Sequence, residues 1–402
     1  MIEIKDKKNC TSCFACYNIC PKNAIIMKED KEGFKYPKID KSKCVNCGLC
    51  DKVCPIINRK NETNKNNKRP KIIAAWCKDN NIRLDSTSGG VFSEIAKKIY
   101  NEGGYVCGAI YNKEWLVEHY ISNDIKDLER LRSSKYLQSD VNDIFRKIKK
   151  LLEENKKVLI CGSPCQIAGL YNFLGKNYEN LYTLDFICRG MNSPKIFKEY
   201  IQSLENRYKS KVVNIKFKHK IHGWHNFSTK IDFENGKTYI GGRYEDSYMI
   251  GYLKYNAFMR PSCYDCQFKE LPRRGDITLA DFWGIEKINP KLDQNKGTSM
   301  ILINSQKGEE LFENIKEGLE FEEIKSEKVF NENVCMKESV KETKERKEVF
   351  NNIDKLTYEQ LSKKYFPEPS NFKKIEIKIV NSKMVNSLKN VLRPIYKKIK
   401  RR

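Results

Sequence analysis

Residues 10–21 read Cys10-Thr-Ser-Cys13-Phe-Ala-Cys16-Tyr-Asn-Ile-Cys20-Pro, and residues 44–55 repeat this cysteine spacing as Cys44-Val-Asn-Cys47-Gly-Leu-Cys50-Asp-Lys-Val-Cys54-Pro. Each run holds three cysteines separated by two residues, then a fourth cysteine followed directly by proline. Three thiolates at this spacing can surround one face of a small metal–sulfur cluster, and the fourth can reach a second cluster. The repeat therefore predicts a compact metal-binding unit at the start of the chain.

The ligand sets follow from the bacterial pattern for two [4Fe–4S] clusters, in which the fourth cysteine of each run binds the other run's cluster. The two predicted sets are Cys10, Cys13, Cys16 and Cys54, and Cys44, Cys47, Cys50 and Cys20. Zinc is the alternative for Cys-x2-Cys pairs, but it takes four ligands and has no use for two triplets that each precede Cys-Pro. We predict a two-cluster ferredoxin-like domain over residues 1–56, which passes single electrons.

The composition describes a globular protein of more than one domain. The 402 residues are 40% hydrophobic and include sixteen cysteines, and no run approaches the length of a membrane-spanning helix. The N-terminal residues contain no apolar segment of the kind that a secretory signal needs. We therefore expect a cytoplasmic protein whose cysteines bind metal rather than form disulfides.

The net charge of +24, from 76 Lys and Arg against 52 Asp and Glu, is a weak guide to function. A basic chain suggests nucleic acid as a partner, but this sequence contains no recognisable nucleic-acid-binding module. A Lys- and Asn-rich composition spread over solvated surfaces explains the charge as well, and thiolate-bound clusters offset part of it. We expect no nucleic-acid partner.

The rest of the chain predicts an α/β body and a helical tail. Residues 57–70 are polar and without periodicity, which is typical of a linker. Strands are expected at 72–77, 105–111, 157–161 and 181–187, and helices at 91–100, 141–154 and 166–174. This alternation favours an α/β core over residues 71–350, and Asn235-Gly236 predicts a hairpin attached antiparallel to its sheet. Residues 351–402 are expected to be a helical, basic tail, so the overall class is α+β.

Eight cysteines lie outside the repeat. Cys165 and Cys188 follow expected strands, at the carboxyl ends where open α/β sheets place their ligands. Cys263 and Cys266 form a lone Cys-x2-Cys pair. From spacing alone, a third metal centre and buried inert thiols are equal alternatives. Cys77, Cys107 and Cys335 are expected to be structural, and Cys161 is left unassigned.

Six motifs occur in a familiar order. They occupy residues 86–94, 134–140, 162–169, 185–190, 260–266 and 275–284. Together they resemble the coenzyme F-420 hydrogenase/dehydrogenase beta-subunit family, which is similar to 7-hydroxymethyl chlorophyll a reductase. The resemblance covers about residues 71–350. It implies an oxidoreductase domain that contains FAD and its own [4Fe–4S] cluster, with Cys165, Cys188, Cys263 and Cys266 as ligands. Arg189 stands where this family commonly has histidine after the cysteine.

The predicted FAD site lacks the G-x-G-x-x-G fingerprint. Ser88-Gly89-Gly90 instead precedes a helix whose N-terminus favours an anion such as the FAD pyrophosphate, and a plain helix start with Ser88 as N-cap is the alternative. A second polar loop is either solvated or cofactor-binding, with Lys135 beside a phosphate or the flavin. The resemblance favours cofactor binding. The predicted FAD-binding residues are Ser88, Gly89, Gly90, Ser134, Lys135, Tyr136, Gln138 and Asp281.

Three histidines at positions 219, 222 and 225 are spaced by three residues in an expected strand and turn. Side chains alternate along a strand, so this spacing does not place three rings on one face as a metal site would need. Histidine titrates near neutral pH, which suits a proton donor. We predict His225 or His222 as the catalytic proton donor.

The C-terminal residues suggest a membrane contact. Met384, Leu388, Val391, Leu392, Ile395 and Ile399 form one apolar stripe at helical spacing, among many lysines and arginines. A basic amphipathic helix is typical of attachment to an anionic membrane surface, and a frayed solvated tail is the equal alternative. The expected location is therefore cytoplasmic, with peripheral attachment at the inner membrane face.

Together these features predict an iron–sulfur flavoprotein that passes electrons between its [4Fe–4S] clusters and FAD to reduce or oxidise an organic substrate. Ferredoxin or another redox protein is the expected partner. Family members with a ferredoxin-like domain first often occur near bacterial surface-polysaccharide genes, which suggests that pathway as the setting. The alternative is an electron-transfer subunit of a larger hydrogenase- or dehydrogenase-like complex, with no small-molecule substrate of its own.

Overall fold

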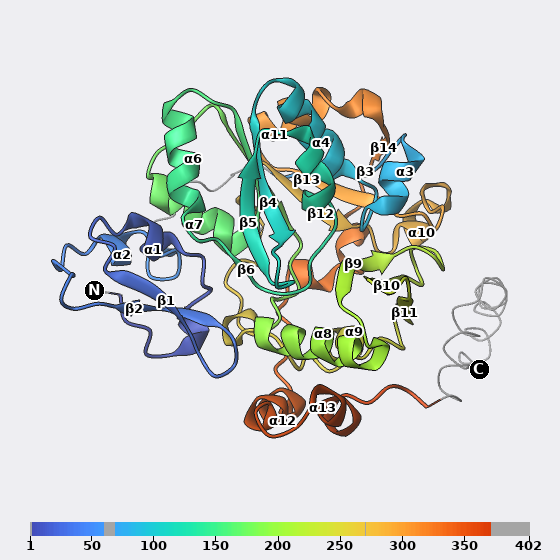
Figure 1. The fold of residues 1–402 in the computed structure, drawn as a ribbon. Coiled ribbons are helices and arrows are strands. Elements are labelled where there is room, and N and C mark those ends of the chain that lie inside the picture. Colours follow the sequence, from blue (N-terminus) through green and yellow to red (C-terminus); the bar gives the residue numbers. More distant parts are fainter. Residues whose placement is uncertain (1, 60–68, 270, 371–402) are drawn as a thin grey trace, which may run out of the picture.

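The computed structural model describes residues 2–59, 69–269 and 271–370. Figure 1 shows a small N-terminal domain beside a large body, with two C-terminal helices below. The expected amphipathic helix at 384–399 lies outside the described residues, as does most of the expected linker. No helix in the described ranges has both the length and the apolar character needed to cross a bilayer.

The sequence repeat of the N-terminal domain is also present in its structure. Strands β1 (Ile25–Glu29) and β2 (Lys35–Ile39) form an antiparallel hairpin, and short helices α1 (Ala15–Ile19) and α2 (Leu49–Lys52) carry the third cysteine of each triplet. The residue before each helix is left-handed, Phe14 with φ 66° and Gly48 with φ 72°. This shared turn reverses the chain within each triplet, so that its three cysteines can face one point.

The body is built on a nine-stranded mixed sheet with the order β14-β3-β13-β12-β8-β7-β4-β5-β6. Its strands are β3 (Lys71–Cys77), β4 (Tyr105–Tyr111), β5 (Val117–Ser122), β6 (Ser139–Asp140), β7 (Val158–Cys161), β8 (Leu181–Phe186), β12 (Ile277–Asp281), β13 (Ser299–Ile303) and β14 (Leu319–Glu323). The central strands β4, β7, β8 and β12 are parallel, whereas β3, β13 and β14 pair antiparallel. The carboxyl ends of the parallel strands therefore share one edge, where α/β sheets place their ligands.

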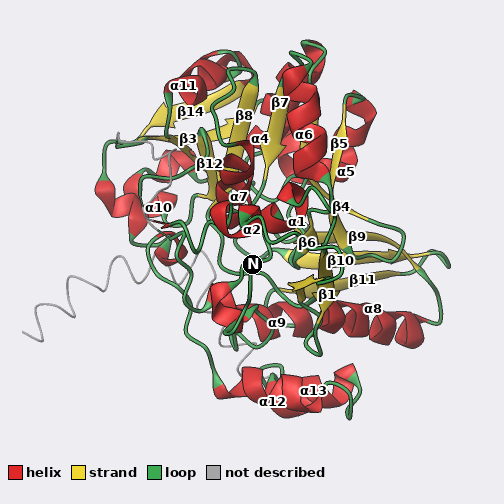
Figure 2. Ribbon diagram, turned by 90° about the vertical axis from the view of Figure 1, so that its left-hand side faces the viewer, coloured by secondary structure: helices red, strands yellow, loops and turns green. Residues whose placement is uncertain are grey.

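Helices cover both faces of this sheet (Figure 2). They are α3 (Asn80–Asp85), α4 (Val91–Asn101), α5 (Leu128–Leu131), α6 (Ile144–Glu153), α7 (Pro164–Leu174), α10 (Ile285–Ile288) and α11 (Gln306–Glu313). Helices α4 and α11 pack with one face of the sheet in one apolar cluster, and α6 and α7 pack with the other face in a second. The second cluster includes Phe14 and Ala15, so the N-terminal domain shares its core with α6 and α7.

A separate three-stranded sheet, β11-β10-β9, stands beside the large one. It comprises β9 (Val212–His219), β10 (Ser228–Phe233) and β11 (Thr238–Gly242). The hairpin predicted from Asn235-Gly236 is confirmed, with Gly236 at φ 79°. Its predicted attachment to the α/β sheet is wrong, because β10 pairs with β9 instead.

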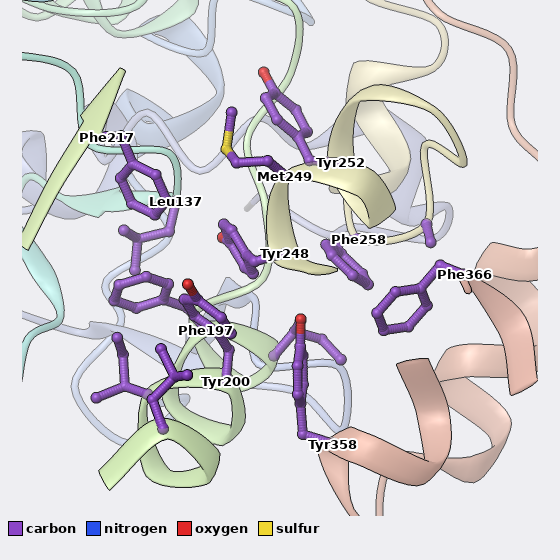
Figure 3. Packing of buried hydrophobic residues seen from close by; sticks show 14 of the residues in the cluster. Leu137, Phe197, Tyr200, Phe217, Tyr248, Met249, Tyr252, Phe258, Tyr358 and Phe366 are labelled. Carbon is purple, nitrogen blue, oxygen red and sulfur yellow. The ribbon is translucent and has the colours of Figure 1, made fainter. Parts of the chain in front are cut away.

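An aromatic core joins this small sheet to α8 (Pro194–Tyr208), α9 (Ser247–Leu253) and the C-terminal helices α12 (Lys344–Asn352) and α13 (Tyr358–Tyr365). Figure 3 shows Tyr248 between Phe197, Tyr200 and Phe258. Tyr200 and Tyr248 stack at 5.1 Å between ring centroids. Short 3-10 turns complete the described elements: η1 (Lys7–Asn9), η3 (Ile125–Asp127), η4 (Pro261–Cys263), η5 (Pro290–Leu292), η6 (Lys316–Gly318), η7 (Glu327–Phe330) and η8 (Val334–Met336).

Candidate functional site

The eight N-terminal cysteines surround two cavities, four thiols to each. One cavity, of about 380 Å³ with its open mouth, is lined by Cys20, Cys44, Cys47 and Cys50 among its residues. The other, of about 350 Å³, is lined by Cys10, Cys13, Cys16 and Cys54. The structure thus brings together the same crossed groups that the spacing predicts. We call them the outer set (with Cys47) and the inner set (with Cys13).

Backbone N–H groups point at sulfur in the outer set. Ala24 donates to the Cys20 thiol at 3.2 Å, and Ile2 donates to the Cys50 thiol at 3.4 Å. Such hydrogen bonds stabilise negative charge on cluster sulfur and so raise the reduction potential. The backbone around these cysteines therefore suits thiolates as well as thiols.

The inner set is buried, and burial governs its protonation. Burial raises the pKa of Cys13 and of Cys16, and neighbouring thiols of the set raise both further. Buried thiols of this kind release their protons when metal binds, so the energy of metal binding is also energy of folding. In the described part of the chain, no three His, Cys, Asp or Glu side chains converge as they would on a single ion. A [4Fe–4S] cubane spreads its four thiolates over four irons, and the two four-thiol cavities fit that donor arrangement.

A third set of thiols, Cys165, Cys188, Cys263 and Cys266, comes together from separate segments of the body. Burial raises the pKa of Cys165 to about 12, and the charges of Cys266 and Cys263 add to that shift. Burial raises the pKa of Cys263 to about 11, with Cys266 as the next contribution. Burial also raises the pKa of Cys188, Lys269 opposes this, and the other three thiols add to it. The four thiols, each partly buried, are therefore electrostatic neighbours, which fits a third cluster.

Polar groups around the third set support charge on its sulfurs. The Met191 N–H donates to the Cys263 thiol at 3.4 Å, and the Ser163 hydroxyl lies 3.2 Å from the Cys165 thiol. The buried Lys269 ammonium donates to the Cys188 carbonyl and, at 3.0 Å, to the Cys335 carbonyl. A buried positive charge beside this set lowers the free-energy cost of keeping its thiols ionised as thiolates.

Cys335 lies near this set, which its lone position in the sequence does not indicate. It belongs to η8. The Arg189 guanidinium lies 3.7 Å from the Cys335 thiol and donates to the Leu253 carbonyl at 2.9 Å and the Asn256 amide oxygen at 2.7 Å. Arg189 therefore packs near the third set and is held by backbone and amide contacts. It occupies the position where the resemblance predicts histidine.

The inner set and the third set are neighbours. Helix α7 begins with Cys165 in its first turn and passes Cys13 one turn later at Gly169. A Cβ at position 169 would lie 2.9 Å from the Cys13 thiol, which is closer than normal packing allows. The absence of a side chain at Gly169 therefore lets α7 press against the inner set. The Cys165 charge also contributes to the raised pKa of Cys13.

Arg260 ties the same two sets together. It is 1% exposed and lies three residues before Cys263. Its guanidinium donates to the Cys10 carbonyl at 2.7 Å, the Lys35 carbonyl at 3.0 Å and the Gln138 amide oxygen at 3.1 Å. One buried cation therefore links the loop that carries the inner set to the segment that carries half of the third set.

Gln138 lies at this junction and not with the other predicted FAD-binding residues. Its amide nitrogen donates to the Thr11 carbonyl at 3.2 Å, and its amide oxygen accepts from Arg260. Both polar atoms of the Gln138 amide therefore form hydrogen bonds at the junction of the two domains. Gln138 was predicted to bind FAD, and in this structure its side chain serves the domain junction.

Two further arginines fix the N-terminal domain to the body. Arg146 on α6 donates to the carbonyls of Asn18 at 2.6 Å and Cys20 at 3.0 Å. Arg346 on α12 pairs with Glu32 at 2.6 Å, with both side chains largely buried. The domain is therefore bound on several sides, with each of these bonds made by a cation of the body.

The two predicted FAD loops lie side by side. The Ser134 N–H donates to the Thr87 hydroxyl at 2.8 Å, and the Ser133 hydroxyl donates to the Asp85 carbonyl at 2.9 Å. Gly90, with φ 90°, is the N-cap of α4 and offers no side chain to its first N–H groups. The alternative that Ser88 caps the helix is wrong, because its hydroxyl donates to the Thr298 carbonyl at 2.9 Å.

Gly89 is held by backbone packing. Its N–H donates to the Ser299 hydroxyl at 2.9 Å, and a Cβ would lie 2.4 Å from the Ala75 carbonyl oxygen. Only glycine fits this approach of the loop to β3 and β13. Gly89 therefore allows the loop to approach the sheet closely, and its own N–H is already hydrogen-bonded to Ser299.

The side chains of Lys135 and Asp281 both bind other groups of the protein. The Lys135 ammonium donates to the carbonyls of Arg130 at 2.8 Å and Arg132 at 3.0 Å, at the end of α5, and burial lowers the pKa of Lys135 to about 7. Asp281 pairs with Lys218 and accepts from the Trp224 indole at 3.2 Å. Burial opposes the charge on Lys218, but Asp281 and Tyr136 together raise the pKa of Lys218. Tyr136 and Asp281, both predicted, thus meet at a lysine that sequence reasoning missed.

Three lysines at alternate positions of β9 and its extension, Lys216, Lys218 and Lys220, reach toward the predicted FAD loops. Lys216 pairs with Asp85, and Lys220 donates to the carbonyls of Arg83 and Ser88. Lys218 has a positive φ of 52°, and the register between β9 and β10 shifts beside it, so a bulge interrupts the regular alternation of side chains. The three lysines connect the small sheet to the loops, and their spacing by two residues in the sequence was the available signal.

Aromatic rings gather next to these lysines. Trp224 and Trp283 stack at 4.5 Å with an interplanar angle of 4°, and the Arg243 guanidinium lies 5.3 Å from the Phe227 ring and 5.9 Å from the Trp283 ring. We call Trp224, Trp283, Phe227, Lys218 and Arg243 the basic aromatic face. Such a face can bind planar or anionic groups through stacking and charge.

The predicted proton donors differ in their surroundings. The His225 ring lies 6.2 Å from the Trp283 ring, and its Nε2 lies 2.8 Å from an Asp293 carboxylate oxygen. The hydrogen bond to Asp293 raises the pKa of His225, while burial opposes the shift. His222 is exposed to solvent. Of the two, His225 is the one that borders the basic aromatic face.

Comparison with protein families finds two matches along the chain. Residues 9–56 match the 4Fe–4S dicluster domain, and residues 155–328 match the C-terminal region of the coenzyme F420 hydrogenase/dehydrogenase beta-subunit family. The resemblance inferred from the six motifs is confirmed, and so is the iron–sulfur character of the N-terminal domain. No curated protein matches the chain.

Among solved structures, the chain is similar to a chain of the F420-reducing [NiFe] hydrogenase complex from Methanosarcina barkeri. The match has 15% sequence identity and a TM-score of 0.43, and it covers 66% of this chain and 90% of that chain. A likeness at this level supports no argument about function. The family resemblance therefore depends on the sequence matches: residues 155–328 match the model of the C-terminal region of the coenzyme F420 hydrogenase/dehydrogenase beta-subunit family, and a match to the 4Fe–4S dicluster domain precedes them in the same chain.

Proposed function

We propose that this chain is an iron–sulfur flavoprotein oxidoreductase with three [4Fe–4S] clusters in series and FAD. The observation that carries the proposal is the contact between the inner and third thiol sets through α7, where Gly169 touches Cys13 and Cys165 begins the helix. Two four-thiol sets in one domain form a short relay for single electrons. A third set, linked to that relay through α7, extends it into the body.

The order of the sets follows from their positions. The outer set contains the exposed Cys47, the inner set is buried, and Cys165 of the third set lies in the first turn of α7, which packs against Cys13 of the inner set at Gly169. Arg260 and Gln138 fix the loop of the inner set against the segment of the third set through buried hydrogen bonds. A relay needs such fixed spacing, because the rate of electron transfer falls steeply with distance.

FAD binding is supported by the two adjoining polar loops and the uncapped start of α4. The first N–H groups of this helix and its dipole favour a phosphate, and Lys220 is bonded to the same loop at Ser88. When bound, FAD would exchange single electrons with clusters and a pair with an organic molecule. Tyr136 and Lys218 would border the flavin from the strand side.

The substrate is proposed to bind at the basic aromatic face. Trp283 is partly exposed, and Arg243 makes its contacts in the described residues with aromatic rings only. A cation next to partly exposed aromatic rings suits an organic anion or a sugar ring. We propose surface polysaccharide synthesis as the setting and His225 as the group that holds the proton for the substrate.

Anaerobic purification with quantitation of iron, sulfide and FAD tests the proposal. We expect about twelve irons, from three four-iron clusters, and one FAD per chain. The double variant Cys263→Ser/Cys266→Ser should retain about eight irons, while the matched control Cys335→Ser should keep about twelve. Eight irons in the unchanged protein would refute the third cluster. The absence of bound flavin would refute FAD binding.

Turnover separates this proposal from the alternative of an electron-transfer subunit. A monomer that carries all its cofactors and reduces or oxidises a small organic compound with dithionite or ferredoxin as the electron source supports an enzyme. A protein with full cofactor content that exchanges electrons only when a partner protein is added supports the alternative.

A further inference from the structure

The outer thiol set is the solvent-facing end of the proposed relay. Cys47 is exposed, whereas all four cysteines of the inner set are buried. Figure 1 shows α2, which carries Cys50, farther from the body than α1. A protein that exchanges electrons with the relay therefore reaches this end first.

Unpaired lysines lie near the cysteines of the outer set, in the cavity lining or close by in the sequence. Lys22 lines the cavity of the set, Lys41 lies three residues before Cys44, and Lys52 lies two residues after Cys50. All three are exposed, and none forms an ion pair within the part of the chain that the structure describes. Lys43 differs, because it pairs with Asp40 at 3.4 Å. The unpaired ammonium groups outnumber the carboxylates of Asp40 and Asp51 in the same segment, and Asp40 pairs with Lys43, so this end carries a net positive charge from its side chains.

An apolar residue lies among these lysines. Val45 lines the same cavity between Cys44 and Cys47, and it is 59% exposed. Transient redox interfaces are small, with a few apolar contacts inside a charged rim. An exposed Val45 with lysines close by matches that composition.

The other sides of the domain are already in use. Arg146, Arg260 and Arg346 of the body bind the backbone near Cys20, the carbonyl of Cys10 and the carboxylate of Glu32. These bonds hold the domain in place, so that the outer set stays exposed and does not turn toward the body. The geometry leaves one end of the domain available to a second protein.

We propose that this surface, formed by Val45, Cys47, Lys22, Lys41 and Lys52, is the docking site for an acidic one-electron carrier protein of the ferredoxin kind. The proposal rests on the proposed function, because it requires a cluster in the outer set. In the exchange, one electron leaves the reduced carrier and enters that cluster, so the carrier is oxidised and the cluster reduced. No bond forms or breaks and no proton moves. Opposite charges on the two surfaces would speed encounter and orient the carrier.

The test uses the anaerobic full-length protein and an acidic plant-type [2Fe–2S] ferredoxin. The dissociation constant with oxidised ferredoxin and the rate of cluster reduction by reduced ferredoxin are measured from low to high salt. We expect binding and rate to fall at least tenfold as salt screens the charges. Binding and rate that stay constant or rise with salt would overturn the proposal without any variant.

Charge reversal locates the surface. The variant Lys22→Glu/Lys41→Glu/Lys52→Glu should weaken ferredoxin binding at least tenfold at low salt and lose most of the salt dependence. The matched control is Lys126→Glu/Lys237→Glu/Lys291→Glu, three exposed lysines of the body that make no ion pair in the described residues. It carries the same change in net charge and should bind as the unchanged protein does. Equal weakening in both variants would show that only net charge matters and would contradict the site.

Two measurements keep this outcome separate from that of the proposed function. Iron content and the rate of reduction by reduced methyl viologen, a small cation, report whether the outer cluster is present and can accept electrons. A charge-reversed variant with full iron, normal viologen reduction and normal ferredoxin binding refutes the docking site alone. Absence of iron from the outer set in the unchanged protein refutes the proposed function, and the docking site with it.

Discussion

The thiol sets and the basic aromatic face show two different ways of building a site. In the N-terminal domain, each ligand set draws on two runs of twelve residues, and the runs repeat. In the basic aromatic face, Lys218, Trp224 and Trp283 come from separate strands and loops, and Asp281 neutralises Lys218. The first site is encoded by spacing and the second by topology.

The difference follows from the chemistry of each ligand. A cluster needs thiolates at fixed positions around a compact core, so few sequences satisfy it and the spacing identifies them. A flavin or an organic substrate is bound through many weak contacts, which different residue types can supply. Residue type therefore identifies the first site and only suggests the second. Variants at the contact between the inner and third thiol sets should break the first site, and variants of the basic aromatic face should test the second.

The largest effect is expected at the contact between the inner and third sets. Gly169→Leu would place a side chain where Cys13 already lies within 2.9 Å of a Cβ position. We expect destabilisation of about 3 kcal/mol and loss of about four irons from the inner set, measured by thermal unfolding and iron analysis. Gly175→Ala is the control, since a Cβ there meets nothing within 4 Å, although φ at position 175 is positive. Full iron in Gly169→Leu would contradict close contact between α7 and the inner set.

Arg260→Gln should come next. Its three donors serve two backbone carbonyls and Gln138 inside the domain junction, so a shorter neutral side chain leaves buried acceptors unpaired. We expect a loss of about 3 kcal/mol in stability and faster limited proteolysis of the protein. Arg260→Lys should recover part of both. If the domains stay joined and stability is unchanged, Arg260 does not hold the junction.

Asp281→Asn tests the basic aromatic face. Lys218 would remain buried without its counter-charge, which costs about 3 kcal/mol for a buried pair. The double variant Lys218→Met/Asp281→Asn should recover much of that loss, because no unpaired charge remains. Chemical denaturation measures both, and bound FAD is quantified alongside. Additive losses in the double variant would show that the two side chains do not interact.

The smallest effect is expected at His225. Since the folded pKa of His225 is raised, its pair with Asp293 stabilises fully below the unfolded histidine pKa of about 6.5 and is lost as pH rises through the folded value. His225→Gln should therefore cost below about 1 kcal/mol at pH 6 and less at pH 8. A cost that grows from pH 6 to pH 8 would contradict the pairing.

Much of the body could be predicted because its elements follow simple periodicities. The expected strand at 105–111 coincides with β4, and the expected helix at 91–100 lies within α4. The separate small sheet could not be predicted, because an Asn-Gly turn defines a hairpin but not the strand that it joins. Local sequence says little about pairing between distant strands such as β9 and β10.

The candidate site also divides into residues whose placement the sequence predicts and residues whose placement it does not. The crossed thiol sets of the N-terminal domain are found as the spacing predicts, and the third set converges at the strand ends where topology places ligands. Lys135 and Gln138 differ, because their polar groups bind backbone carbonyls at α5 and at the domain junction. A polar side chain in a loop has several possible partners, and only the folded chain selects among them.

The most direct test of a continuous three-cluster relay is electron paramagnetic resonance of the fully reduced, anaerobic protein. We predict about three unpaired spins per chain, one for each [4Fe–4S] cluster, with signals broadened by magnetic interaction between neighbouring clusters. Cys263→Ser/Cys266→Ser should lower the count to about two. A spectrum of two spins in the unchanged protein, or three sharp and independent signals, would contradict a third cluster in contact with the inner one.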